Sequence, residues 1–250
     1  MSVPRPTAMD HSPSDGDLEG LRCADLAVVG MLAGASNHTL LVRVDSGERF
    51  AVYKPRRGER PLWDFPPGTL YRREVAAYEV SDYLGWDLVP PTVARDGPLG
   101  IGSVQQFMVH DPQEHYFTLI EDDGLHPRLA QLAAFDLLIN NADRKGGHVL
   151  RVADDGRLVG IDHGLTFHIE PKLRTVIWDL GGTAIPAAWR DDLRRLADAL
   201  SVDGDDLASL QELLDGDEIA VLRRRAELLA ASEALPDVAP ERRPYPWPPL

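Results

Sequence analysis

The first half of the chain alternates short hydrophobic stretches with turn residues, a pattern that predicts β-strands. Three apolar stretches lie within residues 26–55, and the turn residues 45–47 (Asp-Ser-Gly) separate the last two. Runs of this length bounded by turn residues are typical of a β-hairpin or meander. Two further strands are predicted within residues 88–110, where prolines and glycines mark an edge and a bend.

Longer apolar patterns predict helices in other parts of the chain. Residues 70–85 repeat apolar positions at roughly helical spacing and end at Gly85, a residue that favours a helix end. Residues 129–140 are apolar with little interruption, as in a helix buried in a core. Residues 149–163 predict two strands joined by a turn, and residues 189–235 are helical again. The layout is therefore α+β, with a β-rich N-lobe, a mainly helical C-lobe and a cleft between them.

Shifts in composition divide the 250 residues into four parts. We expect the N-lobe at residues 23–110 and the C-lobe at residues 111–236. Residues 1–22 carry Pro, Ser and Asp without apolar periodicity, so they are expected to form a disordered lead-in. Residues 237–250 form a proline-rich tail, which either docks on a partner's aromatic groove or packs back onto the body of the protein.

The charge balance narrows the choice of partners. Asp and Glu number 40 against 26 Lys and Arg, which gives a formal net charge of -14 at pH 7. A surface this acidic repels nucleic acid and anionic membranes, so we expect neither as a partner. No apolar run approaches the ~20 residues that cross a bilayer, and no signal peptide is evident, which predicts a cytoplasmic location. The single cysteine, Cys23, excludes an internal disulfide and is expected to be a buried thiol.

Three features of the N-terminal half carry candidate binding chemistry. The small residues 34–37 lie between two predicted strands, where their backbone amides can approach an anion and the Ser36 hydroxyl adds a donor. Lys54 ends an apolar strand and can hold a phosphate as a compact cation. Glu74, on the following helix, can pair with Lys54. Each feature also has an ordinary interpretation, as a hairpin turn, a solvated strand edge and a surface charge respectively.

Two loops of the C-terminal half concentrate more polar chemistry. Residues 140–148 (NNADRKGGH) follow the buried helix, which positions two basic side chains, several polar ones and two glycines in a short loop. In the segment IDHGLTF, an apolar strand ends at Asp162. A carboxylate so placed suits Mg²⁺, which takes one or two protein oxygens and completes its shell with phosphates and water. The alternative for Asp162 is an Asx-type turn that Gly164 ends.

In this order, the motifs resemble the phosphatidylinositol 3- and 4-kinase-like superfamily, most closely type II phosphatidylinositol 4-kinase-like proteins and a mainly actinobacterial subgroup. The resemblance covers about residues 26–189. FDLLINNADRKGGH is similar to the family's helix and N-x-D-R-x-x-x-N catalytic loop, and IDHGLTF is similar to its I-D-N-G-L-A-F metal loop. The resemblance implies a bilobal protein-kinase-like α+β fold and ATP as the cofactor.

The resemblance also implies how the nucleotide is held. Lys54 contacts the α- or β-phosphate of ATP and pairs with Glu74. The backbone of Ser36 and Asn37 covers the phosphates. The adenine lies against the main chain of a hinge-like strand, whose residues are Gln106, Phe107, Met108 and Val109.

For catalysis, the resemblance implies that Asp143 positions or deprotonates the acceptor hydroxyl. Arg144 steadies the loop or the transferring phosphate, with Lys54 as the third catalytic residue. Asp162 is the implied ligand of Mg²⁺. Where the family carries a metal-binding Asn, this chain has His148. Because imidazole suits Mn²⁺ better than Mg²⁺, either the second metal is held differently or the chemistry has changed.

The predicted function is an ATP-dependent phosphotransferase that moves the γ-phosphate to a hydroxyl of a small molecule or a protein. The net charge disfavours lipid, although the basic loop 56–60 (RRGER), followed by Trp63 and Phe65, can contact lipid, an acidic peptide or a phosphorylated metabolite. Three alternatives stay open: a nucleotide-binding pseudokinase, which His148 and its preceding glycines favour, a phosphatidylinositol kinase, and transfer of AMP instead of phosphate.

Overall fold

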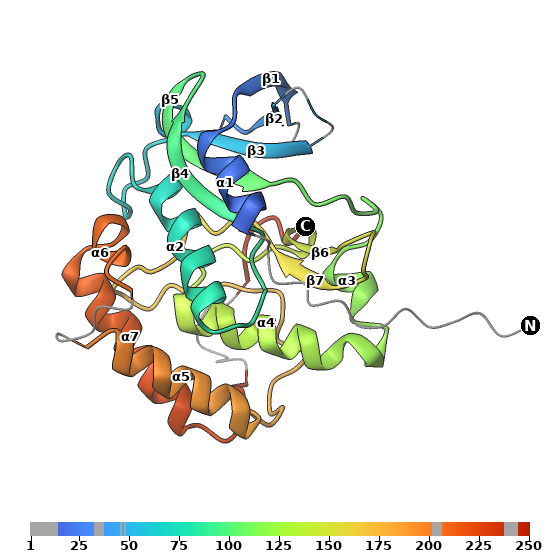
Figure 1. The fold of residues 1–250 in the computed structure, drawn as a ribbon. Helices are drawn as coiled ribbons and strands as arrows, with labels where there is room; N and C mark the ends of the chain where they lie inside the picture. The colour runs from blue at the N-terminus through green and yellow to red at the C-terminus, as the bar shows by residue number, and fades with distance from the viewer. Residues whose placement is uncertain (1–14, 33–37, 46, 48, 202–206, 238–244) are drawn as a thin grey trace, which may run out of the picture.

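The computed structural model describes residues 15–32, 38–45, 47, 49–201, 207–237 and 245–250. The chain forms a β-sheet lobe followed by a mostly helical lobe (Figure 1). This arrangement confirms the predicted α+β layout, with a β-rich N-lobe and a mainly helical C-lobe.

Five strands form the sheet of the N-lobe, in the spatial order β1-β2-β3-β5-β4, and all neighbours are antiparallel. They are β1 (Leu26–Met31), β2 (Leu40–Val44), β3 (Arg49–Pro55), β4 (Thr92–Gly97) and β5 (Gly100–Gln106). Successive side chains of a strand point to opposite faces of the sheet. Tyr53 is therefore buried in the N-lobe core, while Lys54 points the other way, toward the helix α2 (Leu70–Tyr83).

The helix α1 (Asp15–Cys23) corrects the last part of the expected disordered lead-in, because residues 15–22 are helical; residues 1–14 lie outside the described residues. Leu18 and Leu21 pack into the core of the N-lobe against the sheet. Because they are three residues apart, they share one face of the helix, and their burial stabilises a segment whose overall composition is polar. Cys23, two residues beyond Leu21 on another face, is exposed rather than buried as expected.

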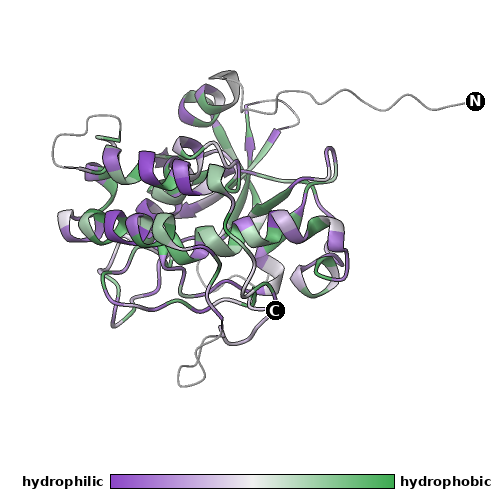
Figure 2. Ribbon diagram, turned by 90° about the horizontal axis from the view of Figure 1, so that it is seen from below, coloured by the Kyte–Doolittle hydropathy of each residue, from purple (hydrophilic) through white to green (hydrophobic). Residues whose placement is uncertain are grey.

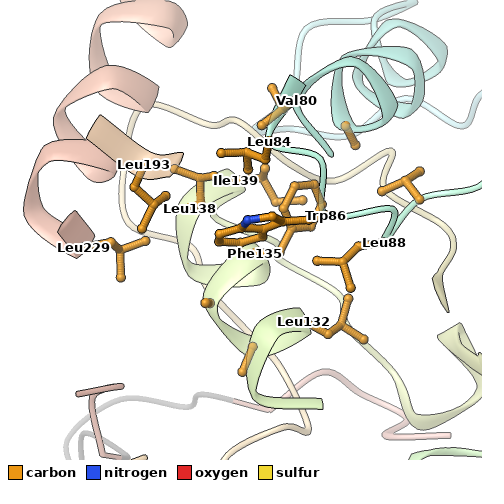
Figure 3. Close-up of a cluster of buried hydrophobic side chains, with 14 of the residues drawn as sticks. Val80, Leu84, Trp86, Leu88, Leu132, Phe135, Leu138, Ile139, Leu193 and Leu229 are labelled. Carbon is orange, nitrogen blue, oxygen red and sulfur yellow. The ribbon is translucent and has the colours of Figure 1, made fainter. Parts of the chain in front are cut away.

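The C-lobe is built around the helix α4 (His126–Ile139), which is buried along most of its length as its apolar sequence predicts. Figure 3 shows Phe135 of this helix beside Trp86, in a buried cluster that also contains Val80 of α2. The other elements are α3 (Tyr116–Leu119), α5 (Ala187–Ala199), α6 (Leu210–Leu213), α7 (Gly216–Ala231), the hairpin strands β6 (Val149–Arg151) and β7 (Leu158–Gly160), and the 3-10 turns η1 (Arg56–Gly58), η2 (Asp123–Leu125) and η3 (Gly146–His148).

Hydrophobic and hydrophilic residues are interleaved along the long helices of the C-lobe (Figure 2). In α5, for example, Leu193 and Leu196 are buried, whereas Arg194 and Arg195 lie toward solvent. The stripe of apolar residues faces the core and the charged stripe faces water, as in other surface helices. None of the helices in the described part of the chain is both long and apolar enough to cross a membrane.

Candidate active site

The centre of the site is a cluster of charged side chains where the two lobes meet. Lys54 Nζ donates to Glu74 Oε1 and lies 2.7 Å from Asp162 Oδ1. Glu74 is buried, and its Oε2 accepts from the backbone amide of His163 at 2.9 Å. The Asp162 side chain is 48% exposed, so it is open to a ligand from solvent. We call Lys54, Glu74, His148 and Asp162 the inter-lobe cluster.

The three charged groups of the inter-lobe cluster control one another's ionisation. Burial lowers the pKa of the Lys54 ammonium, but the carboxylates of Asp162 and Glu74 outweigh this effect and hold the pKa above its ordinary value. Burial raises the pKa of the Glu74 carboxyl, against the attraction of Lys54. Partial desolvation also works against ionisation of Asp162, yet Lys54 holds the pKa of that carboxyl well below its usual range. One ammonium is thus shared by two carboxylates, which leaves negative charge for a further cation to neutralise.

His148 brings the loop that contains Asp143 next to Asp162. Burial lowers the pKa of His148 to about 4, so the ring is neutral at pH 7. Its Nδ1 lies 3.1 Å from the backbone oxygen of Asp143, which can only accept, so Nδ1 carries the proton. Nε2 then presents its lone pair to Asp162 Oδ2, 3.3 Å away. Two acceptors that face each other at this distance are suited to a cation held between them.

A divalent metal fits this pair of acceptors only if other ligands complete its shell. Within the described residues, no group of three or more His, Cys, Asp or Glu side chains is arranged to hold a metal ion. Asp162 and His148 would supply two ligands, and nucleotide phosphates and water the others, as Mg²⁺ and Mn²⁺ accept in nucleotide sites. Asp162 also has a left-handed backbone with φ 61°, a conformation rare outside glycine and frequent at functional sites.

The loop after α4 presents Asp143 beside a lysine. The left-handed conformation of Asn140, with φ 52°, ends α4 and turns the chain into this loop. The Asp143 amide donates to Asn141 Oδ1 at 3.0 Å. Burial raises the pKa of the Asp143 carboxyl. Lys145 Nζ lies 3.3 Å from Asp143 Oδ2. Sequence analysis assigned no role to Lys145, although a basic residue two positions after the expected acceptor-positioning carboxylate was a signal for one.

Arg144 lies behind this loop, away from solvent. Its side chain is fully buried and forms a multiply hydrogen-bonded ion pair with Asp136 of α4, with N–O distances of 3.0 and 3.1 Å. It also donates to the backbone oxygens of His148 and Ile161 and to His163 Nε2. Of the two roles expected of Arg144, steadying the loop or steadying the transferring phosphate, the structure fits the first, because the guanidinium donates to protein acceptors on every side. These bonds tie together the two loops that carry Asp143 and Asp162.

Asp136 was missed by sequence analysis. Besides Arg144, its carboxylate accepts from Asn141 Nδ2 at 2.9 Å and from Thr175 Oγ1 at 3.3 Å. The signal was a single charge inside the apolar segment 129–140, because a buried carboxylate needs a partner. His163 was likewise unassigned; burial lowers the pKa of its ring, and a neutral ring is what allows Nε2 to accept from Arg144.

The expected hinge lies between the two lobes, directly after β5. Gln106 is the last residue of β5, and the Phe107 amide donates to the backbone oxygen of Phe50 at 3.0 Å. Within the described residues, the backbone amides of Met108 and Val109 donate to no partner. They are the groups that the edge of a purine ring could engage. Met108 itself is buried in a small apolar cluster with Leu150, Val152 and Val159.

Two expected phosphate-covering residues, Ser36 and Asn37, lie outside the described residues. The flanking segment is described, and the His38 amide donates to the backbone oxygen of Gly58 at 3.3 Å. This bond holds the end of the expected loop against η1, directly after the strand that carries Lys54.

The described end of the proline-rich tail, residues 245–250, packs back onto the body of the protein, which was one of the two arrangements expected of the tail. The Gly146 amide donates to the backbone oxygen of Pro249 at 2.7 Å, and Pro246 is buried. The C-terminus accordingly lies near β6 in Figure 1. Because Gly146 follows Asp143 by three residues, the tail borders the loop that carries this carboxylate.

Comparison with known proteins fits this geometry. No protein-family model matches the chain. Protein Rv2133c of Mycobacterium tuberculosis (strain ATCC 25618 / H37Rv) is 42% identical over 263 residues, which cover 90% of this chain and 92% of that protein. The chain belongs to the family of Rv2133c. A 42% identity over nearly the whole of both chains indicates that this family shares the fold described above.

A solved structure with a similar fold covers most of this chain. The structure of hydra Fam20 with sugar has a TM-score of 0.56 at 16% identity, over 87% of this chain and 88% of that one. The Helicobacter pylori proinflammatory kinase CtkA has a TM-score of 0.47 at 12% identity, over 85% of this chain and 94% of that one. With its β-sheet N-lobe and helical C-lobe, this chain has a bilobal protein-kinase-like fold.

Proposed function

We propose that this protein is an ATP-dependent phosphotransferase that transfers the γ-phosphate to a hydroxyl group. The observation that carries the proposal is the meeting of three elements at one point: Lys54 from the sheet, Asp162 from the loop after β7, and Asp143 from the loop after α4. His148 lies between the two aspartates, 3.1 Å from the Asp143 backbone and 3.3 Å from the Asp162 carboxylate. Phosphoryl transfer depends mainly on positioning and charge neutralisation, which such a set of residues provides.

Each residue has a defined task in this proposal. Lys54, held by Glu74, binds a phosphate oxygen of the nucleotide, and the amides of Met108 and Val109 bind the adenine. Asp162 Oδ2 and His148 Nε2 would hold Mg²⁺ or Mn²⁺. The metal, when bound, neutralises charge on the β- and γ-phosphates.

Asp143 acts on the acceptor. Its carboxylate takes the proton of the acceptor hydroxyl as the hydroxyl oxygen bonds to the γ-phosphorus, and the bond from that phosphorus to the bridging oxygen of ADP breaks. Burial raises the pKa of Asp143, which makes it a stronger base than a free carboxylate. Lys145, 3.3 Å from Asp143, adds positive charge where the transferring group carries negative charge. Arg144 is a positioning residue for both loops.

A direct test is incubation of the purified protein with ATP labelled at the γ-phosphate, with Mg²⁺ or Mn²⁺ and a cell extract as the source of acceptor. We expect label on an acceptor or in free phosphate, and its loss in Asp162→Ala. Asp154→Ala, an equal charge change in the exposed turn between β6 and β7, is the matched control and should keep the wild-type rate. Equal rates in Asp162→Ala and wild type would contradict the proposal.

The same assay separates the alternatives. Label incorporated into vesicles that contain phosphatidylinositol would establish the lipid acceptor that the sequence resemblance favours. Incorporation of label from the α-phosphate of ATP would indicate transfer of AMP. Binding of ATP without release of label under either metal would identify a nucleotide-binding pseudokinase, the outcome that His148 in place of Asn favours.

A further inference from the structure

A second concave site lies outside the inter-lobe cluster, between the loop that joins β3 to α2 and the tip of the β4–β5 hairpin. It is a pocket of about 580 Å³, a size that accepts a small molecule. Three arginines line it, Arg56, Arg57 and Arg60, with a single acidic residue, Glu59. Glu59 Oε1 accepts from the Tyr71 amide at the start of α2 at 2.9 Å, whereas Glu59 Oε2 is buried without a hydrogen-bond partner within the described residues.

The charge of this pocket is unusual for the molecule. The chain carries a formal net charge of -14, and its other guanidinium groups are commonly paired with carboxylates, as in Arg151 with Glu114. The side chains of Arg56 and Arg57 are exposed and have no ion-pair or hydrogen-bond partner within the described residues. Guanidinium groups gathered in a concavity form a fork-like site for phosphate or carboxylate oxygens.

The backbone of Gly68 runs close to the guanidinium of Arg56 at the edge of the pocket. Gly68 has a left-handed backbone with φ 77°, and a Cβ at this position would lie 2.5 Å from Arg56 Nε. The guanidinium of Arg56 therefore crosses the loop where only glycine leaves room. Most of the remaining wall is apolar, so the pocket has a positively charged end and a hydrophobic side. The hydrophobic side includes Pro61, Leu62, Phe65, Pro66, Leu99 and Ile101.

The pocket is joined to the loop of the expected acceptor-positioning carboxylate. Phe65 and Leu70, which line the pocket, pack against Ala142, the residue before Asp143. On its other side, Arg56 follows Lys54 by only two residues. The pocket therefore shares an apolar wall with the loop that carries Asp143 and begins two residues after Lys54 in the chain.

We propose that this pocket anchors the acceptor, and that the acceptor is a small molecule carrying a phosphate or carboxylate group and an apolar body in addition to its reactive hydroxyl. This assignment rests on the phosphotransferase function proposed above. The concave shape favours a small molecule over a flat membrane surface. On a chain with a net charge of -14, the three arginines make this pocket a place where an anion is attracted rather than repelled.

Binding of phenyl phosphate, which combines a phosphate with an apolar ring, tests the pocket without ATP. Calorimetric titration should give saturable binding that is weaker for inorganic phosphate and absent for phenol. Arg56→Ala/Arg57→Ala should weaken binding at least about tenfold, because two charge-assisted contacts are lost. Gly68→Ala should weaken it as well by displacing Arg56. The matched control is Arg223→Ala/Arg224→Ala, an equal charge change on α7, which should bind like wild type.

The outcomes separate this proposal from the proposed function. Binding that survives Arg56→Ala/Arg57→Ala but is lost in Lys54→Ala would place the anion at the inter-lobe cluster and overturn the pocket. Binding to phosphatidylinositol vesicles without binding of phenyl phosphate would assign the arginines to a membrane surface and would also overturn the pocket as an acceptor site.

In the labelled-ATP assay, phenyl phosphate should reduce transfer to extract components without affecting ATP binding. Unchanged transfer at a saturating concentration of phenyl phosphate would exclude an acceptor site. Failure of the phosphotransferase itself shows separately, as absence of any label released from ATP.

Discussion

Two groups of charged side chains are connected to the loop that carries Asp143, and they differ in how fully their polar atoms are hydrogen-bonded. Asp136 and Arg144 are both fully buried, and their polar atoms are bonded to each other and to neighbouring protein groups. In the inter-lobe cluster, one ammonium serves two carboxylates, and Asp162 is half exposed. A saturated buried pair fixes structure, whereas an undersaturated exposed one is ready for a ligand.

Replacing an aspartate by asparagine in each group, at Asp136 and at Asp162, gives the sharpest contrast between stability and activity. Asp136→Asn leaves the guanidinium of Arg144 buried without a counter-charge, and we expect a loss of about 3–5 kcal/mol in the free energy of unfolding. Urea denaturation followed by circular dichroism measures this loss. Arg151→Ala, which breaks a partly exposed pair with Glu114, is the comparison and should cost about 1 kcal/mol or less. Equal losses in the two variants would show that the Asp136–Arg144 pair is not the structural support of the loop.

Asp162→Asn should have the opposite profile. The amide keeps the size of the side chain and tolerates the left-handed backbone, so unfolding should change by less than about 1 kcal/mol. It removes the charge that Lys54 and a metal require, so the rate of label release from ATP should fall by about 100-fold or more. Thermal unfolding and the labelled-ATP assay on one preparation test both halves. A variant that unfolds easily but retains its rate would reverse the roles assigned to the two pairs.

The sequence was sufficient for the long elements and for the positions of the charged motifs. Apolar periodicity records burial, so the sheet strands, α2 and α4 were predicted, whereas the nine-residue α1 was hidden because only Leu18 and Leu21 carry its apolar signal. Spacing along the chain does not reveal which way a side chain points. For this reason Arg144, beside Asp143 in the sequence, was assigned in part to the phosphate although it is directed into the core.

The identity of the residue at position 148 tests the metal side of the inter-lobe cluster. His148→Asn replaces imidazole nitrogen with the amide oxygen that Mg²⁺ prefers, so the ratio of Mg²⁺-supported to Mn²⁺-supported transfer should rise by about tenfold. Initial rates with each metal across a range of concentrations measure the ratio. His126→Asn, at the start of α4 and away from the cluster, should leave it unchanged. An unchanged ratio in His148→Asn would mean that His148 does not bind the metal.

The smallest expected effects come from Gly146 and Gly147, the two glycines of the loop that carries Asp143. A Cβ added to Gly147 meets no atom within 4 Å, so Gly147→Ala should stabilise the protein by about 0.4–1 kcal/mol through the unfolded state. A Cβ added to Gly146 would lie 2.9 Å from Phe117 Cε2, so Gly146→Ala should destabilise it. Thermal unfolding separates the two variants, and the labelled-ATP rate of Gly147→Ala then shows whether the loop must be pliable. An unchanged rate would mean that Arg144 already fixes Asp143 and that the flexibility of Gly147 has no part in catalysis. A reduced rate would mean that the loop moves between ATP binding and phosphate transfer, while the Asp136–Arg144 pair holds one end of it in place.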